Sequence, residues 1–307
     1  MFRQDNFGVS LSLRGVTYKL FSVLFFVSMA SIIKKTSETI PFGEAVFFRS
    51  FFALPVIFCW LIFSSSLRSG LKIVSLTGHL WRGFVGTTAM AFMFLGLGIL
   101  PLPEVTAIGY SAPILTVVFA IFILKENVKL FRLGAVAIGF LGVIIILAPR
   151  LTVVYSGNEF SLQQLGASFV FLGAIFMAFA HVFIRKLTKT ETASSIVFYF
   201  TLSSCLWALF TIPFGWVIPD QYSFILLVLS GVLGGFGQIF LTQAYKFSEA
   251  SVVAPFEYVS IIFASLMSYF IFCELITLEV FIGSVFVIFA GMIIIWRERK
   301  LGIDRSD

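Results

Sequence analysis

The segment YSAPILTVVFAIFILKE (Tyr110–Glu126) is matched 148 positions later by YVSIIFASLMSYFIFCE (Tyr258–Glu274), with no gap needed. Outward from these segments, the match extends over Arg82–Arg150 and Ser230–Glu298. Identical residues are few, but the apolar blocks and their interruptions coincide throughout. Because a long internal repeat determines the whole architecture, we interpret the chain as two copies of one unit.

The composition is that of a membrane protein. Of the 307 residues, 59% are hydrophobic and 12% are charged, and the mean hydropathy is +1.05, whereas a soluble domain averages about 25% charged residues. The apolar runs are continuous rather than alternating, which favours helices over a β-barrel. Since one crossing takes about 20 apolar residues, we predict ten spans. They cover residues 17–33, 45–63, 78–100, 103–124, 130–148, 165–184, 194–216, 222–245, 250–273 and 278–296.

The first apolar run has some features of a secretory signal peptide. Arg14 and Lys19 precede it, and Ser28–Ala30 is similar to a cleavage site. Cleavage would remove a span that the repeat requires, so we expect the run to be the first span.

The Lys and Arg distribution predicts that both termini lie in the cytoplasm. In that arrangement only three of the 21 Lys and Arg residues lie in outer segments, namely Lys34, Lys35 and Arg150. Arg49 lies within the second span, and the others, Lys19 and Arg82 among them, fall on the inner side. This pattern accounts for the net charge of +6 without nucleic acid as a partner. We expect a multi-pass protein of a bacterial inner (plasma) membrane.

The repeat is predicted to be inverted. Each half, residues 17–150 and 162–298, holds five spans, so the second copy enters the membrane upside down. The link at 125–132 is basic and inner, while its counterpart at 273–280 contains no Lys or Arg. A chance match of hydrophobic segments would explain neither this charge inversion nor the repeated Tyr–Glu pair. The predicted fold is all-α and integral to the membrane, with ten transmembrane helices as two inverted five-helix repeats, a common construction of secondary transporters.

Several motifs resemble the EamA-type carriers of the drug/metabolite transporter superfamily, over about residues 17–297. They are Phe48–Ser50, Pro103–Ala107, Tyr110–Pro113, Lys125–Asn127, Ala244–Tyr245, Glu249–Pro255 and Cys273–Glu274. The resemblance implies a central cavity lined by spans other than the fifth and tenth, and a small metabolite as substrate. Within the family, Arg49, Arg82–Gly83 and Ala254–Tyr258 most resemble S-adenosylmethionine or riboflavin carriers. Glu257 departs from many relatives, so their substrates do not transfer directly.

Glu257 is the first candidate for function, because an ionisable group inside a span is costly. It lies about 10 Å into the ninth span, at 1.5 Å per residue, directly after Pro255 and Phe256. Glu257 could act in transport, by binding a substrate cation or by coupling transport to protons. It could instead be a purely structural carboxylate in a buried pair. Its counterpart in the first copy is Gly109, so the symmetry of the repeat is broken at this position.

Two other ionisable residues lie inside predicted spans. Arg49 is expected to hold a substrate anion through its planar guanidinium, or instead to extend to the interface or pair with Glu44 or Glu104. His181 is a second proton-coupling candidate, since histidine titrates near neutral pH; the alternative is a hydrogen-bonded structural residue.

Neutral side chains complete the predicted substrate site. Tyr110 and Tyr258 occupy equivalent positions and suit a planar ligand, although packing between helices is the alternative. Gln238 and Tyr245, seven apart on one helix face, and Thr88 are expected to add polar lining.

The function predicted from these residues is secondary transport of a small organic metabolite by alternating access. S-adenosylmethionine, riboflavin and amino-acid-like compounds are the expected substrates, with possible proton coupling, and efflux of a metabolite or drug is the alternative direction. A membrane-embedded enzyme is disfavoured, because the spans contain no Asp, and His79 and His181 are the only histidines. We therefore expect no catalytic residues, no metal and no cofactor. A scaffold or receptor role stays open, and the sequence does not determine the oligomeric state.

Overall fold

The computed structural model describes residues 5–63, 71–125, 134–135, 137–142, 144–145, 162–273 and 277–301. Within these ranges the chain is helical, with no strand. Six helices there are long and apolar enough to cross a membrane, and shorter apolar helices follow at Ala193–Leu209, Phe256–Phe272 and Phe281–Ala290. The described part of the fifth predicted span is helical, and the rest of that span lies outside the described residues. The architecture agrees with the predicted ten-span, all-helical membrane protein.

The first half contains three long helices followed by an interrupted one. These are α1 (Asp5–Thr36), α2 (Phe42–Phe63) and α4 (Leu76–Leu97), and then α5 (Leu102–Gly109), α6 (Ser111–Phe119) and the π-helical turn η1 (Ala120–Leu124). Pro103 lies in the first turn of α5, where its missing N–H is tolerated.

The second half repeats this order. It consists of α8 (Leu162–Leu187), α9 (Ala193–Leu209), the short 3₁₀ turn η3 (Ile212–Phe214), α10 (Gln221–Phe247), α11 (Ala250–Val253), the 3₁₀ helix η4 (Ala254–Val259), α12 (Ser260–Met267), the π-helical turn η5 (Ser268–Phe272) and α13 (Leu278–Leu301). The seventh span was predicted to reach Trp216, but its helix ends at Leu209. The chain then turns through Gly215, whose φ of 90° suits glycine.

The duplication is visible in an unusual backbone feature. Both η1 and η5 end at a residue with positive φ, Lys125 at 55° and Cys273 at 54°. A non-glycine residue in this region is uncommon, and these two residues are 148 positions apart, the offset of the sequence repeat. Equivalent spans therefore share the same local distortion.

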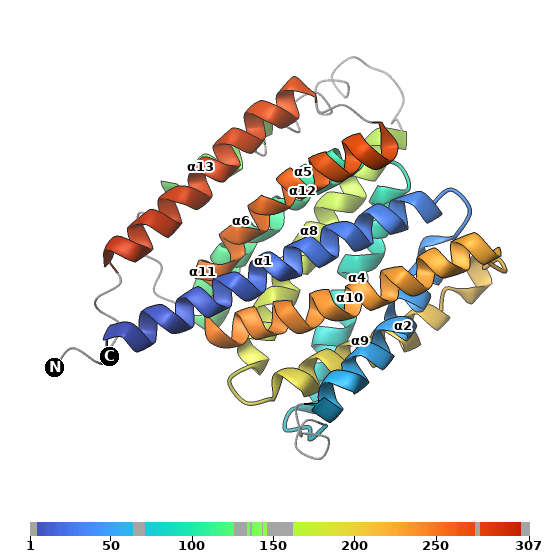
Figure 1. The fold of residues 1–307 in the computed structure, drawn as a ribbon, viewed down its shortest axis with the longest axis horizontal. Helices are drawn as coiled ribbons and strands as arrows, with labels where there is room; N and C mark the ends of the chain where they lie inside the picture. The colour runs from blue at the N-terminus through green and yellow to red at the C-terminus, as the bar shows by residue number, and fades with distance from the viewer. Residues whose placement is uncertain are drawn as a thin grey trace.

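The two halves pack on each other as a pseudo-symmetric pair. In Figure 1, α1 of the first half lies beside α10 of the second. The equivalent pair, α8 with α4, is also in contact, and α2 packs against α9 between them. Such a mutual arrangement is what an inverted repeat produces. The last helix, α13, lies at one edge of the bundle in Figure 1 and packs on α5 and η4.

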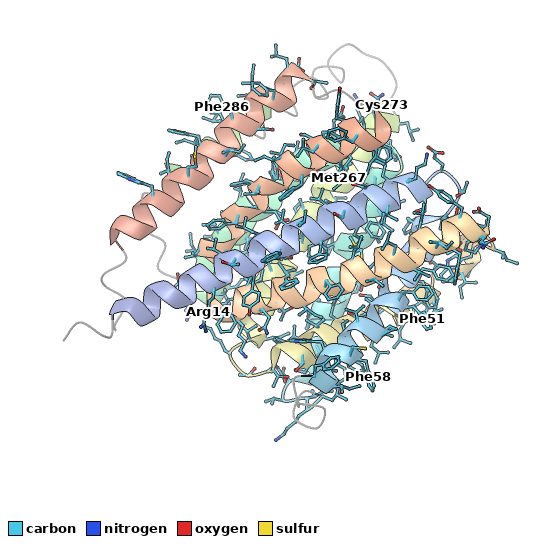
Figure 2. All side chains as sticks on the ribbon, in the orientation of Figure 1. Arg14, Phe51, Phe58, Met267, Cys273 and Phe286 are labelled. Atoms are coloured by element: carbon cyan, nitrogen blue, oxygen red, sulfur yellow. The ribbon has the colours of Figure 1, made fainter. Side chains whose placement is uncertain are left out.

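Large apolar side chains cover the outside of the bundle. Phe51 and Phe58 on α2 and Phe286 on α13 project outward in Figure 2, and each is more than a third exposed. Exposed aromatic residues in such number would aggregate in water. They fit a protein whose surroundings are lipid.

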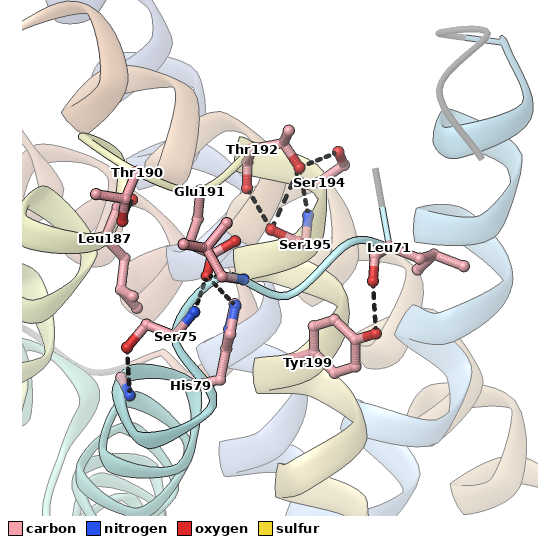
Figure 3. A network of polar contacts seen from close by, with 12 residues as sticks. Leu71, Ser75, His79, Leu187, Thr190, Glu191, Thr192, Ser194, Ser195 and Tyr199 are labelled. Atoms are coloured by element: carbon pink, nitrogen blue, oxygen red, sulfur yellow. Dashed lines mark hydrogen bonds and ion pairs between the residues drawn. The ribbon is translucent and has the colours of Figure 1, made fainter. Parts of the chain in front are cut away.

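A buried carboxylate ties the loop before α4 to the loop before α9 (Figure 3). Glu191 Oε1 accepts hydrogen bonds from the backbone N–H groups of Val74 and Ser75, at 2.8 and 2.7 Å, and lies 3.4 Å from His79 Nε2. In the other half, Glu44 Oε2 accepts from the backbone N–H of Val217 at 3.0 Å. Each half thus uses an acidic residue near its second helix to fix the loop that precedes the third helix of the other half.

Candidate functional site

A cavity of about 180 Å³ lies in the middle of the bundle, between the two halves. Its wall is built by α1, α2, α4, α5, α8, α9, α10, η4 and α12, mostly through methionine, phenylalanine and aliphatic side chains. Among the described residues, neither α13 nor the helical part of residues 134–145 contributes to it, as the family resemblance implied for the fifth and tenth spans. The lining residues include two arginines, a histidine and a glutamate, namely Arg49, Arg82, His181 and Glu257.

Glu257 lies on η4 at the cavity wall and forms an ion pair with Lys19 of α1. The Lys19 side chain is 1% exposed, and that of Glu257 is 20% exposed. Lys19 Nζ also lies 5.9 Å from the centre of the Tyr245 ring. The structure therefore corrects one expectation: Lys19 is not a cytoplasmic flanking charge, because α1 begins at Asp5 and carries Lys19 well inside the bundle.

Gly109, the counterpart of Glu257 in the first copy, also lines the cavity. The two copies thus present the same position to the same space. One presents a carboxylate and the other presents no side chain, so the cavity is electrostatically asymmetric.

Arg49 is buried on α2, with 1% exposure, and faces the cavity. Its Nη2 donates to the carbonyl oxygen of Gly234 at 3.3 Å. It pairs with neither of the predicted acidic partners, since Glu44 instead bonds to Val217, and it does not extend to the membrane interface. The position of Arg49 at the cavity is compatible with anion binding, one of the roles predicted for it.

Arg82 was missed as a site residue. It was counted with the inner flanking charges, yet it is 3% exposed on α4 and lines the cavity. Its Nη2 donates to Gln238 Oε1 at 3.4 Å, and its guanidinium carbon lies 3.7 Å from the centre of the Phe200 ring. The available signal was its position inside the third predicted span, beside Gly83 and Gly86.

The structure places Gln238 and His181 at the cavity and Tyr245 behind it. Gln238 accepts from Arg82, as described. Tyr245 is fully buried and does not line the cavity; its ring lies 5.2 Å from that of His181. Arg185 Nη1 donates to the Tyr245 carbonyl oxygen at 2.9 Å. Tyr245 therefore supports His181 and Lys19 from the end of α10.

Only one of the two equivalent tyrosines reaches the cavity. Tyr110 lines it, donates through Oη to the carbonyl oxygen of Tyr258 at 3.2 Å, and accepts from Ser260 Oγ at 3.2 Å. The rings of Tyr110 and Tyr258 meet edge to face, with centres 5.3 Å apart. Tyr258 is buried behind Tyr110, a position that fits the alternative role of packing between helices.

Thr88 lies away from the central cavity. It borders a separate crevice formed by α2, α4 and α9, together with Thr87 and Thr211. Thr87 Oγ1 is hydrogen-bonded to Ser204 Oγ at 2.8 Å, which joins α4 to α9. The face of α4 that carries Thr88 is thus turned from the face that carries Arg82.

Comparison with known proteins agrees with this architecture. The model of the EamA-like transporter family matches residues 13–148 and again residues 164–297. The chain is 28% identical over 260 residues to an S-adenosylmethionine uptake transporter of Rickettsia prowazekii (strain Madrid E), covering 84% of each chain. It is 27% identical over 284 residues to the pseudopaline exporter CntI of Pseudomonas aeruginosa (strain UCBPP-PA14), covering 90% of this chain and 94% of that one.

A protein of known crystal structure shares the fold. It superposes with a TM-score of 0.73 over 94% of this chain and 98% of its own, at 16% sequence identity. Since both family matches together span most of the sequence and each coincides with one half of the bundle, the chain belongs to the EamA-like transporter family.

Proposed function

We propose that this protein imports S-adenosylmethionine, or a metabolite with the same amino-acid and cationic groups, by alternating access. The chain is also similar to an S-adenosylmethionine uptake transporter of Rickettsia felis (strain ATCC VR-1525 / URRWXCal2), at 26% identity over 96% of this chain. The observation that carries the proposal is the Lys19–Glu257 pair at the wall of the central cavity. A carboxylate at this position suits a positively charged substrate.

In this proposal the substrate cation replaces Lys19 as the partner of Glu257. A buried carboxylate without a partner is costly, so Glu257 leaves Lys19 only when another cation or a proton arrives. Lys19 remains close to the Tyr245 ring, whose face favours a cation. The exchange couples occupancy of the cavity to the contact between α1 and η4, two elements from different halves.

The cavity wall fits the remainder of such a substrate. Met90, Met93 and Phe94 of α4 line it beside Tyr110. Polarisable sulfur and aromatic groups pack well against a heterocyclic ring. No step in this scheme breaks a covalent bond, so we assign the chain no catalytic activity.

The proposed location is a bacterial inner membrane, with both termini in the cytoplasm. Removing the buried residues Lys19 and Arg82 from the count of flanking charges leaves the inner side far richer in Lys and Arg. The orientation can be tested by the reactivity of single cysteines placed in the loops towards an impermeant thiol reagent.

Uptake by proteoliposomes tests the proposed function. Purified protein is reconstituted and exposed to radiolabelled S-adenosylmethionine, with imposed pH and electrical gradients. We expect saturable uptake and exchange with unlabelled substrate inside the vesicle, and no uptake by protein-free liposomes. Absence of both uptake and exchange, with protein that is folded and inserted, would reject this substrate.

Export is the second candidate direction, because the chain is similar to a pseudopaline exporter over 90% of its length. Both directions require the same cavity and differ in the driving gradient. Flux measured with each gradient reversed distinguishes them.

A further inference from the structure

Two arginines at the central cavity have no acidic partner in the part of the chain that the structure describes. Arg49 and Arg82 are 1% and 3% exposed, and neither makes a salt bridge within the described residues. Each guanidinium forms one weak hydrogen bond through Nη2, to Gly234 at 3.3 Å and to Gln238 at 3.4 Å. The Nε and Nη1 atoms of both arginines have no hydrogen-bond partner among the described residues.

The fold brings these two guanidinium groups together. Gly234 and Gln238, their respective partners, are four residues apart on α10 and thus lie on one face, about 5–6 Å apart. Both guanidinium carbons also lie over the same Phe200 ring, at distances of 6.0 and 3.7 Å from its centre. Two positive charges therefore meet at the cavity wall.

Small residues make room for both groups. A Cβ atom on Gly86 would collide with Arg82 Nη1, and a Cβ atom on Gly234 would lie 2.6 Å from Arg49 Nε. Gly86 and Gly234 occupy equivalent positions in the two repeats, 148 apart. Each repeat thus supplies one glycine whose missing side chain accommodates one guanidinium.

Such an arrangement is unfavourable without a ligand. Like charges repel, and an unpaired buried ion carries a penalty of several kcal/mol. The Phe200 ring offsets part of this penalty through cation–π attraction. An anion that accepts a charge-assisted hydrogen bond from a free Nε or Nη1 group of each arginine offsets far more, because hydrogen bonds between ionised partners are strong.

We propose that Arg49 and Arg82, with Gln238 positioning Arg82, form the binding site for the carboxylate of the transported metabolite. The site lies at the middle of α10, on the same cavity as Glu257. A substrate with an amino-acid group would then place its carboxylate on the arginines and a cationic group at Glu257. This assignment rests on the proposed function and extends it to a substrate class, metabolites that carry both a carboxylate and a positive charge.

The site also suits alternating access. Arg49 is seven residues from the start of α2, and Arg82 is six residues from the start of α4. α2 and α4 belong to successive predicted spans, which cross the membrane in opposite directions. Each arginine therefore lies about 10 Å along its helix from an opposite membrane face, at 1.5 Å per residue. A carboxylate bound between the two guanidinium groups therefore has one arginine on the side of each membrane face.

Equilibrium binding to purified protein tests this assignment with two ligands, S-adenosylmethionine and its decarboxylated analogue. Because hydrogen bonds to charged groups are strong, we expect wild-type protein to bind the analogue about 10- to 100-fold more weakly. Arg49→Gln and Arg82→Gln should each bind both ligands with similar, low affinity. Arg14→Gln, at an exposed arginine of α1, serves as the matched control and should behave as wild type.

The two proposals fail in different ways. Equal binding of both ligands by wild-type protein overturns the carboxylate site and leaves the transport function standing. If wild-type protein binds neither, S-adenosylmethionine is rejected, and thermal unfolding with methionine, methioninamide and glycerol 3-phosphate decides the carboxylate site. Stabilisation by methionine over methioninamide, lost in Arg82→Gln, supports the site. Stabilisation by glycerol 3-phosphate alone, or by no compound, overturns it.

A second variant guards against misfolding. Arg82→Met removes an unpaired buried charge and keeps most of the side-chain volume. We expect the ligand-free variant to unfold at an equal or higher temperature than wild type, with binding of the carboxylate ligand lost. A large fall in the ligand-free unfolding temperature would show that Arg82 is structural, and would overturn its assignment.

Discussion

Lys19 of α1 and Glu257 of η4 form an ion pair across 238 residues of chain, at the wall of the central cavity. The pair joins the first helix of one repeat to the interrupted ninth span of the other. η4 is a 3₁₀ helix that begins at Ala254 and has a proline in its first turn. The short helical turn directs Glu257 towards α1, and its contact with Lys19 therefore reports on how the two halves are positioned.

Glu257→Gln should abolish the pH dependence of transport. The amide cannot take up a proton and cannot neutralise a substrate cation, so we expect uptake to fall strongly at all pH values. Initial uptake rates in proteoliposomes between pH 5.5 and 8.5 measure this effect. Glu279→Gln, at an exposed residue of α13, is the matched control. A Glu257→Gln variant with a wild-type pH profile would remove Glu257 from the mechanism.

The Lys19–Glu257 pair should show strong coupling in stability. Lys19→Met leaves the partly buried Glu257 without its cation, which costs up to about 3 kcal/mol. Adding Glu257→Gln removes the uncompensated charge, so the double variant should recover most of that loss. Thermal or denaturant unfolding of the two single variants and the double variant in detergent measures the coupling. Additive effects would mean that the two side chains do not interact in solution.

Gly86→Ala and Gly234→Ala should each weaken substrate binding by displacing a guanidinium group. The added methyl group on Gly86 meets Arg82 Nη1, and that on Gly234 meets Arg49 Nε. Overpacking of this kind typically lowers stability by about 1–3 kcal/mol. If the arginine moves aside instead, it loses a hydrogen bond to the substrate carboxylate worth about 1.5–3 kcal/mol, or roughly 10- to 150-fold in affinity. Gly134→Ala is the control, since a Cβ atom there would meet no described residue within 4 Å. Unchanged affinity in Gly86→Ala and Gly234→Ala would show that Gly86 and Gly234 do not fix the positions of the guanidinium groups.

The sequence predicted the fold better than the site, for physical reasons. Hydrophobic runs and the repeat are properties of consecutive residues, so spans such as α2 and α10 were expected within a few positions of where they lie. Burial near a span end is a property of packing between distant segments. Lys19 and Arg82 lie close to predicted span ends, and positive charge there is usually cytoplasmic.

The symmetry of the repeat was also an incomplete guide to the cavity. Tyr110 follows the α-helical turn of α5, whereas its counterpart Tyr258 lies within the 3₁₀ helix η4. A 3₁₀ helix has 3.0 residues per turn rather than 3.6, so the direction of the tyrosine differs between the copies. Gly109 and Glu257 both line the cavity, but Tyr258 packs behind Tyr110.

Glu191→Ala should loosen the polar contact between the loops before α4 and α9. The substitution leaves the backbone N–H groups of Val74 and Ser75 without their acceptor, and removes the partner of His79. A buried donor that loses its partner costs about 1–3 kcal/mol, so the unfolding temperature should fall measurably. Glu38→Ala, at an exposed residue of the α1–α2 loop, should have little effect. Limited proteolysis of both variants locates the change.

Because the loop before α4 sets the start of the helix that carries Arg82, Glu191→Ala should also lower substrate affinity. An unchanged unfolding temperature together with unchanged affinity would show that the contact contributes to neither.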